Sequence, residues 1–329
     1  MVKTLVDLGA KKEAVKMAAS LHAKNPASLS ATLASAETYY DAADYALALP
    51  LFEFASMAGE NSTPMLRNLA DCYAQTGNSE ACYKVRKQLV EVEAPVLSDM
   101  LKFADSAIFA GRSDEVFPIT SKIIEQDPMN AIALTINGKA YAMGGNRDQA
   151  LEFFSKAIEV GSDDADPWMG LSELQVMGGE FRQAIETLRQ GLAALPADRE
   201  IKRRLAEQLM DSGSASEALP LLNDLAEEDQ DALIGVLQLD ALKILGMPEY
   251  DGMVVSLYSK FPENEEIAQA FAAQLIKNGK HTEAKTVLQA KLSQVQSNTP
   301  IALTYAEAVV GMDVHYSGEP KSISAQEME

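Results

Sequence analysis

Small and bulky apolar residues recur along this chain at a fixed step of 34 residues. The step is marked by glycines at Gly77, Gly111, Gly145, Gly179 and Gly213, with Gly9 two steps earlier and Gly246 and Gly279 at 33-residue steps beyond. Ala43 stands where this series lacks a glycine. A second series of small residues keeps the same step, at Ala36, Ala70, Ala104, Gly138, Ser172 and Ala206. The chain is therefore an array of repeats.

Each repeat is predicted to contain two helices. Apolar and small residues recur at helical spacing in residues 134–141 and again in residues 150–158. Gly145 lies between the two segments, and glycine tolerates the left-handed conformation that follows a helix end. The small residues Gly138 and Ala150 let the two helices approach closely. One helical hairpin cannot bury its apolar faces alone, so neighbouring hairpins must stack on it.

The period divides the chain into units. A partial unit with a shortened first helix is expected at 1–28, and a capping helix at 299–311, where Thr299 is a plausible cap and Pro300 a first-turn residue. Residues 312–329 are polar and are expected to be a disordered tail. Full units are expected at 29–62, 63–96, 97–130, 131–164, 165–198, 199–230, 231–264 and 265–298.

Two consecutive units resemble the tetratricopeptide repeat in both pattern and length. The residues that carry this resemblance are Leu134, Gly138, Tyr141, Gly145, Ala150, Phe154 and Ala157, followed by Trp168, Leu171, Gly179, Ala184, Leu188 and Pro196. The resemblance extends over about residues 1–298 and is weakest at 231–264, where Tyr250 and Asp251 replace the small residue. It implies an all-α, right-handed α-solenoid of about nine hairpins that acts as a protein–protein interaction scaffold or adaptor. In that family, the first helices line a concave groove that binds extended or helical peptides.

The residue after each small core residue is predicted to face this groove. These residues are Glu37, Asp71, Asp105, Lys139, Glu173 and Glu207. Five of the six are acidic, and stacked units would align them in a ladder that attracts basic segments. The alternative is an ordinary solvated face on an acidic protein, and the sequence favours neither interpretation.

A second set of predicted groove residues is apolar and rich in methionine. These residues are Leu101, Ile108, Phe109, Met143, Met169, Val176, Met177 and Met210. Methionine adapts to irregular apolar partners, and an exposed apolar patch usually marks a binding site. The alternative is that these side chains pack between neighbouring first helices as core.

Charge and composition exclude several classes of protein. The chain has 28 Lys and Arg against 48 Asp and Glu, a formal charge of −20, whereas nucleic-acid binding needs an excess of cations. The same charge and the 34-residue step oppose a pentatricopeptide RNA reader. Apolar runs fall short of the roughly 18 residues of a membrane span. Cys72 and Cys82 are predicted to be buried free thiols, with a disulfide as the lesser alternative.

Catalysis is not expected, because the repeats lack a nucleophile, base and orienting group, and too little chain remains outside them for another domain. We accordingly expect no catalytic residue, cofactor or metal site. Trp168 occupies a packing position. The basic cluster at Arg199, Lys202, Arg203 and Arg204 is interpreted as a helix face paired with acids.

The predicted partner is a protein with a basic or amphipathic peptide or helix. The family's carboxylate clamp needs Lys and Asn, but Asp71 follows Arg67 and Glu207 follows Arg203, so capture of an acidic tail is not expected. The alternative function is self-association as a structural module, or a subunit of a secretion or envelope complex. A cytoplasmic location is expected, or a periplasmic one if a signal peptide has been removed.

Overall fold

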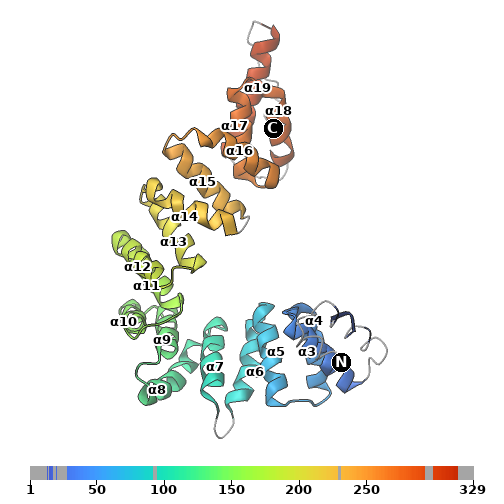
Figure 1. Ribbon diagram of the computed structural model, residues 1–329, viewed down its shortest axis with the longest axis vertical. Helices are drawn as coiled ribbons and strands as arrows, with labels where there is room; N and C mark the ends of the chain where they lie inside the picture. The colour runs from blue at the N-terminus through green and yellow to red at the C-terminus, as the bar shows by residue number, and fades with distance from the viewer. Residues whose placement is uncertain are drawn as a thin grey trace. The chain divides into compact units, whose positions relative to one another are not determined.

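The computed structural model describes residues 13, 15–17, 20, 28–91, 95–228, 231–292 and 299–317. Every regular element in these residues is a helix (Figure 1). The chain separates into two compact units, Met1–Gly178 and Gly179–Glu329, called unit 1 and unit 2. None of the described helices combines the length and apolar character needed to cross a membrane.

Unit 1 is a row of helices in which each element packs on its neighbours along the chain. Hairpins form between α3 and α4, α5 and α6, and α9 and α10, while α7 pairs with the short 3-10 helix η1 and with α8. The elements are α3 (Leu29–Asp41), α4 (Tyr45–Met57), α5 (Thr63–Gln75), α6 (Ser79–Val90), α7 (Leu97–Phe109), η1 (Ser113–Glu115), α8 (Phe117–Gln126), α9 (Ala131–Met143), α10 (Arg147–Glu159) and α11 (Asp166–Met177).

Unit 2 repeats this arrangement. Helices α13 and α14, α15 and α16, and α17 and α18 pair as hairpins, and α19 packs on α17 and α18. The elements are α12 (Phe181–Ala194), α13 (Arg199–Asp211), α14 (Ala215–Glu228), α15 (Ala232–Ile244), α16 (Glu249–Lys260), α17 (Glu265–Lys277), α18 (His281–Leu292) and α19 (Thr299–Ser317).

Polar caps fix where the first helices begin. The Asn130 side chain accepts a hydrogen bond from the Ala133 amide at 3.0 Å, and Asn264 caps α17 in the same way. A capping oxygen satisfies an amide that has no partner inside the helix. Six first helices begin at the first residue of an expected unit: Leu29, Thr63, Leu97, Ala131, Arg199 and Glu265.

The turn inside each hairpin depends on one left-handed residue. Gly145, after α9, has φ of 74°, and glycine adopts this angle without the steric cost that a Cβ atom brings. Ala43 occupies the equivalent place after α3. Its φ is 62°, a positive angle that residues other than glycine rarely adopt. The hairpin geometry is therefore kept even where the glycine is missing.

Phe154 shows why small residues recur at the packing positions. Its side chain is 2% exposed and lies against Gly138 of α9 and Gly170 of α11. A Cβ atom at position 138 would lie 2.7 Å from ring carbon Cδ1, which is closer than atoms can pack. One aromatic ring thus joins α10 to the helix before it and to the helix after it.

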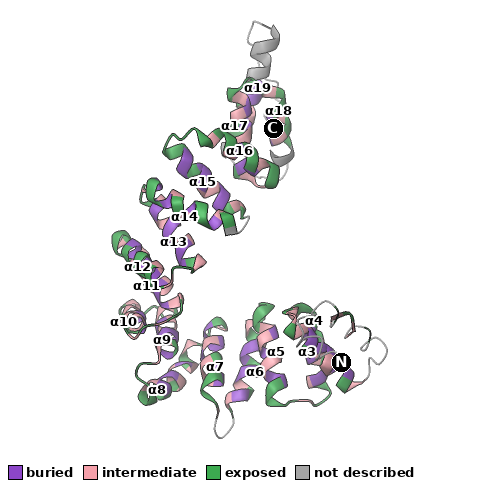
Figure 2. Ribbon diagram, in the orientation of Figure 1, coloured by how far each residue is buried: buried purple, intermediate pink, exposed green. Residues whose placement is uncertain are grey.

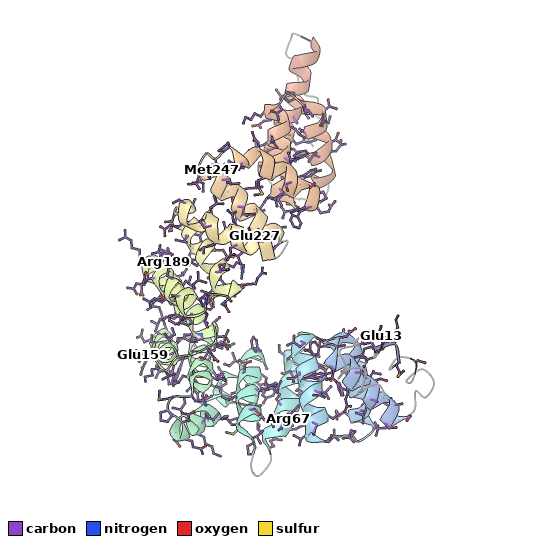
Figure 3. All side chains as sticks on the ribbon, viewed as in Figure 1. Glu13, Arg67, Glu159, Arg189, Glu227 and Met247 are labelled. Carbon is purple, nitrogen blue, oxygen red and sulfur yellow. The ribbon has the colours of Figure 1, made fainter. Side chains whose placement is uncertain are left out.

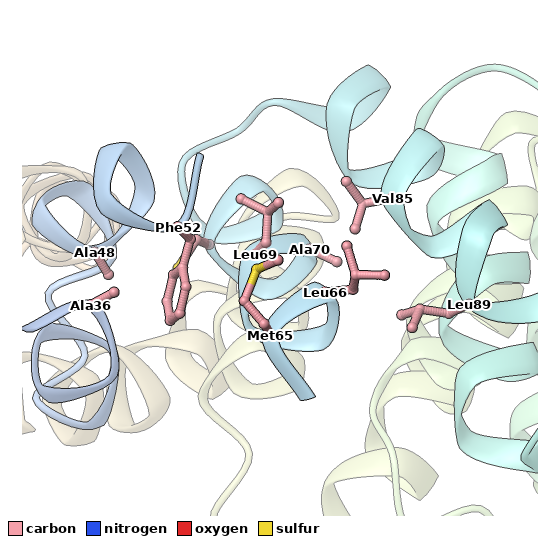
Figure 4. Packing of buried hydrophobic residues seen from close by; sticks show 10 residues of the cluster. Ala36, Ala48, Phe52, Met65, Leu66, Leu69, Ala70, Val85 and Leu89 are labelled. Carbon is pink, nitrogen blue, oxygen red and sulfur yellow. The ribbon is translucent and has the colours of Figure 1, made fainter. Parts of the chain in front are cut away.

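The core continues from one hairpin to the next. Buried faces follow one another along each unit (Figure 2). In the cluster of Figure 4, Ala36 and Ala48 meet between α3 and α4, and Phe52 lies beside Met65 of the following hairpin. Because apolar surface is shared across hairpins, no hairpin is an independent folding unit.

The structure differs from the sequence-based limits in two places. Helix α19 continues to Ser317, beyond the expected end at residue 311. In the unit at 97–130, η1 precedes a short second helix, because Pro118 is confined to the first turn of α8. Most of the partial unit at 1–28 and the tail from residue 318 lie outside the described residues. The handedness of the solenoid and the count of about nine hairpins stay predictions.

Candidate peptide-binding groove

Three consecutive first helices of unit 1 end in a large, exposed apolar residue. Phe109, Met143 and Met177 are the last residues of α7, α9 and α11 and are 67%, 56% and 76% exposed. We call them the apolar stripe. Because each ends its helix immediately before the turn, the repeat places them equivalently. Residues four positions apart share a helix face, so Asp105 lies on the face of Phe109 and Lys139 on that of Met143.

Two adjacent hollows open on this first-helix face. The α5–α7 hollow, of about 530 Å³, is lined by residues that include Asp71, Arg86 and Lys102. The α7–α9 hollow, of about 450 Å³, has apolar walls from Leu101 and Ile132. Both hollows share Lys102, Asp105 and Phe109. Phe109 therefore stands between two depressions, each large enough to hold a side chain of a bound segment.

Asp71 is held by donors from three other helices. It accepts hydrogen bonds from the Tyr40 hydroxyl at 2.9 Å and from the Arg86 guanidinium, and Lys102 Nζ lies 3.4 Å away. Burial, followed by the hydrogen bond to Asp71, raises the pKa of Tyr40. The carboxylate is therefore a structural link between α3, α5, α6 and α7.

Lys139 pairs with acids on both sides of α9. Its Nζ lies 3.4 Å from Asp105 of α7 and 2.5 Å from Asp166 of α11. Burial alone lowers the pKa of Lys139, but Asp105 and Asp166 outweigh it and the net pKa is raised. The ammonium thus stays charged at neutral pH and also lies 6.0 Å from the centre of the Phe109 ring.

The predicted acidic ladder is largely paired. Glu37 and Glu173 are exposed, but Asp71 and Asp105 form the ion pairs described above. Glu207, in unit 2, pairs with Arg203 at 2.6 Å and with Arg204 at 3.4 Å. At these three positions cations from neighbouring turns and helices reach the acid, so the predicted ladder does not present a row of unpaired carboxylates.

The apolar groove residues divide between surface and core. Ile108 is 5% exposed and packs in the cluster that contains Ile136, so its assignment to the groove is wrong. It precedes Phe109 by one residue, which turns its side chain about 100° around the helix and into the core. The half-buried members of the set are Leu101, Met169, Val176 and, in unit 2, Met210.

Several lining residues were not singled out by the sequence pattern. Arg86 comes from a second helix, and Asp164 and Asp166 come from the turn after α10 and the start of α11. Ile132 is 53% exposed on the first turn of α9. Counting back along α9 from Met143 in steps of three or four residues passes Lys139 and reaches Ile132. The helical periodicity of the sequence could therefore have identified Ile132 as a residue of this face.

Arg67, a residue at a clamp-like position, is used in packing. Figure 3 labels Arg67 on unit 1. Its guanidinium donates from Nε to Asp99 Oδ1 at 2.9 Å and from Nη2 to Asp99 Oδ2 at 2.7 Å, and Asp99 of α7 is buried. Asp99 raises the pKa of Arg67. A guanidinium whose Nε–Nη2 edge is already bound to a carboxylate cannot use that edge to capture the terminal carboxylate of a peptide.

The cysteines, the tryptophan and the basic cluster noted in the sequence also serve the packing of the helices. Cys72 and Cys82 are buried free thiols, as the sequence predicted, and burial raises the pKa of Cys72 to about 12. Trp168 is 8% exposed at its packing position. In the basic cluster, Lys202 pairs with Asp224, and Arg203 pairs with Glu200. Within the described residues, no group of three or more His, Cys, Asp and Glu side chains is placed to hold a metal ion.

The fold and the repeat now define the class of protein. A family model described as the tetratricopeptide repeat matches residues 141–203 and 175–238. This match confirms the resemblance seen in the sequence for residues 141–238. Proteins of this kind are in general non-enzymatic scaffolds for protein–protein interaction. No curated protein matches the chain in sequence.

Three of the solved structures that resemble the chain are described as tetratricopeptide repeat proteins. A thermophilic protein from Thermus thermophilus is 21% identical, covers 56% of this chain and all of its own, and has a TM-score of 0.45. YrrB, described as having an unusual peptide-binding site, is 18% identical over 57% of this chain and 98% of its own, with a TM-score of 0.45. A protein from Parabacteroides merdae is 15% identical over 85% of this chain and 98% of its own, with a TM-score of 0.46.

Proposed function

We propose that unit 1 binds a short segment of another protein on its first-helix face. The apolar stripe supports this proposal, because it exposes three large apolar side chains at equivalent places on three neighbouring helices. Solvent-exposed apolar surface that is continuous from element to element marks interaction sites in proteins. The two hollows beside Phe109 supply the depressions that anchoring side chains need.

The ligand that fits this face is an amphipathic segment with basic flanks. Its large apolar side chains pack against Phe109 and Met143 and into the α7–α9 hollow. Cations on its flanks meet Asp164 and Glu173, which are exposed, in the field of a chain with a net charge of −20. Because Asp71 and Asp105 are already paired, apolar contacts supply most of the affinity, and the acids mainly select the charge of the partner.

A peptide-array measurement on the full chain tests this proposal. Peptides selected by the wild type are titrated against a Met143→Glu, Met177→Glu double variant. We expect affinity to fall at least about tenfold, because two carboxylates would be placed in an apolar contact. Met129→Glu is the matched control, since Met129 is 68% exposed but does not line either hollow.

Unchanged affinity in the double variant, with folding intact by circular dichroism, would reject the first-helix face as the binding site. A loss of equal size in Met129→Glu would also reject it. Raising the salt concentration should weaken binding only modestly, because exposed charges are screened while apolar contacts are not.

A further inference from the structure

Helix α4 is apolar on two opposite sides. One side carries Ala48, Phe52 and Ala55, which are fully buried in the core. The opposite side is exposed, and we call it the outer face of α4. It consists of Ala46, Leu47, Pro50, Phe54, Met57 and Ala58. Soluble helices normally oppose an apolar stripe with a polar one, and a helix that is apolar all round is normally covered all round.

The large residues of this outer face are spaced for contact with another helix. Leu47, Pro50, Phe54 and Met57 follow one another at steps of three, four and three residues, which is the spacing of side chains that mesh between two helices. Leu47, Phe54 and Met57 are 49%, 40% and 81% exposed. A helix of 13 residues is about 20 Å long, which sets the length of the helix that would lie along it.

The stretch of sequence that contains α4 is acidic. Between Asn25 and Leu66 the sequence contains neither Lys nor Arg, whereas it contains Glu37, Asp41, Asp44, Glu53 and Glu60. Two of these acids accept hydrogen bonds from neutral donors. Asp44 accepts from the Leu47 amide at 3.4 Å, and Glu53 accepts from the Tyr73 hydroxyl at 2.8 Å. Neither bond cancels the negative charge. Asp44, Glu53 and Glu60, which lie on α4 or at its ends and which we call the acidic rim, therefore favour a cationic partner.

We propose that the outer face of α4 binds a basic amphipathic helix of another protein. The apolar side of that helix packs on Leu47, Phe54 and Met57, and its Lys and Arg side chains pair with the acidic rim. A second copy of this chain fits poorly, because α4 against α4 would bring identical acids together on two molecules of charge −20. This surface is separate from the first-helix face, since it belongs to the second helix of a different hairpin.

The test uses the full chain and a designed probe. The probe is a fluorescent peptide of about four helical turns, with Leu at three-four spacing and Lys elsewhere, and its control replaces every Lys by Glu. We expect the wild type to bind the Lys probe and to bind the Glu probe at least about tenfold more weakly. A Phe54→Ser, Met57→Ser double variant should weaken binding of the Lys probe at least about tenfold.

Two further variants keep the test decisive. Met57→Lys changes the most exposed position alone and should also weaken the Lys probe without affecting thermal stability. The α4 substitutions are also made in a Phe109→Ser background, which removes the contribution of the apolar stripe. There they should weaken the Lys probe by the same factor, so this proposal and the proposed groove can fail separately.

Four outcomes would overturn the proposal. The first is equal affinity for wild type and both α4 variants, and the second is the absence of any α4 effect in the Phe109→Ser background. The third is a wild-type dimer by light scattering that the α4 variants dissociate, and the fourth is a marked fall in thermal stability of Met57→Lys. The third would identify a second copy as the occupant, and the fourth would show that the chain itself covers this face.

Discussion

At the scale of single residues, the hairpin turn depends on a backbone angle that only glycine adopts freely. Gly77, Gly111 and Gly145 have φ between 72° and 78° at this place. Ala43 has φ of 62°, where the Cβ atom crowds the following carbonyl oxygen. The turn after α3 is therefore strained in a way that the other turns are not.

Replacing Ala43 by glycine should remove this strain. We expect Ala43→Gly to stabilise the protein by about 0.5–1 kcal/mol, because relief of the left-handed strain exceeds the greater freedom of glycine in the unfolded chain. The measurement is the urea midpoint followed by circular dichroism. Gly77→Ala, with φ of 78° at the equivalent turn, should lower the midpoint. A lower midpoint for Ala43→Gly would show that the strain is absent.

At the scale of helices, side-chain bonds hold neighbouring hairpins in place. The Tyr73 hydroxyl on α5 donates to Glu53 on α4 at 2.8 Å. Burial, followed by this bond to Glu53, raises the pKa of Tyr73 from 10.0 to about 12. The folded protein therefore holds the phenol proton more tightly than the unfolded chain does. The resulting stabilisation is complete below pH 10 and is lost as pH rises toward 12.

Alkaline unfolding tests this link between α4 and α5. The urea midpoint of the wild type should fall as pH rises from about 10 toward about 12, and the fall should be shallower in Tyr73→Phe, which has no proton to lose. Tyr40→Phe should act in the same direction, since burial and Asp71 raise the pKa of Tyr40 as well. Identical slopes in wild type and Tyr73→Phe would contradict the structural role of this bond.

At the scale of the whole molecule, stability is distributed along the chain. In the described residues, helices pack on neighbours that are close in sequence. Such arrays unfold in parts when their internal interfaces differ in strength. The single tryptophan, Trp168 on α11, and the thiols Cys72 and Cys82 of the α5–α6 hairpin provide two natural probes in unit 1.

Unfolding in urea should give two different curves with these probes. We expect the fluorescence of Trp168 and the reactivity of the thiols toward a disulfide reagent to change at different urea concentrations. Gly138→Ala, whose Cβ atom would collide with Phe154, should lower the Trp168 midpoint more than the thiol midpoint, with a local loss of about 1–3 kcal/mol. Coincident curves in wild type and variant would show that unit 1 unfolds as one cooperative body.

The repeat was predictable because its causes are local. A turn glycine, a small packing residue and a polar cap each act within one helix or one hairpin, so their step places the first helices at Thr63, Leu97 and Ala131, where the structure has them. The same register made Phe109, Met143 and Met177 equivalent positions, but whether they face solvent or pack as core stayed open until the structure showed them exposed. The extra turns of α19 were missed, because the sequence from residue 311 onward no longer shows a clear period.

The amino-acid sequence alone determined that this chain is a stack of helical hairpins, since period, turn and cap chemistry are written in neighbouring residues. Only the tertiary structure decided which side chains of a helix remain exposed to a binding partner. Ile108 is buried in a cluster that includes Ile136, Asp71 is paired with Arg86, and α4 keeps an uncovered apolar side. The physical reason is that burial and ion pairing are set by residues of other helices, and a repeat pattern does not specify which neighbours those helices bring.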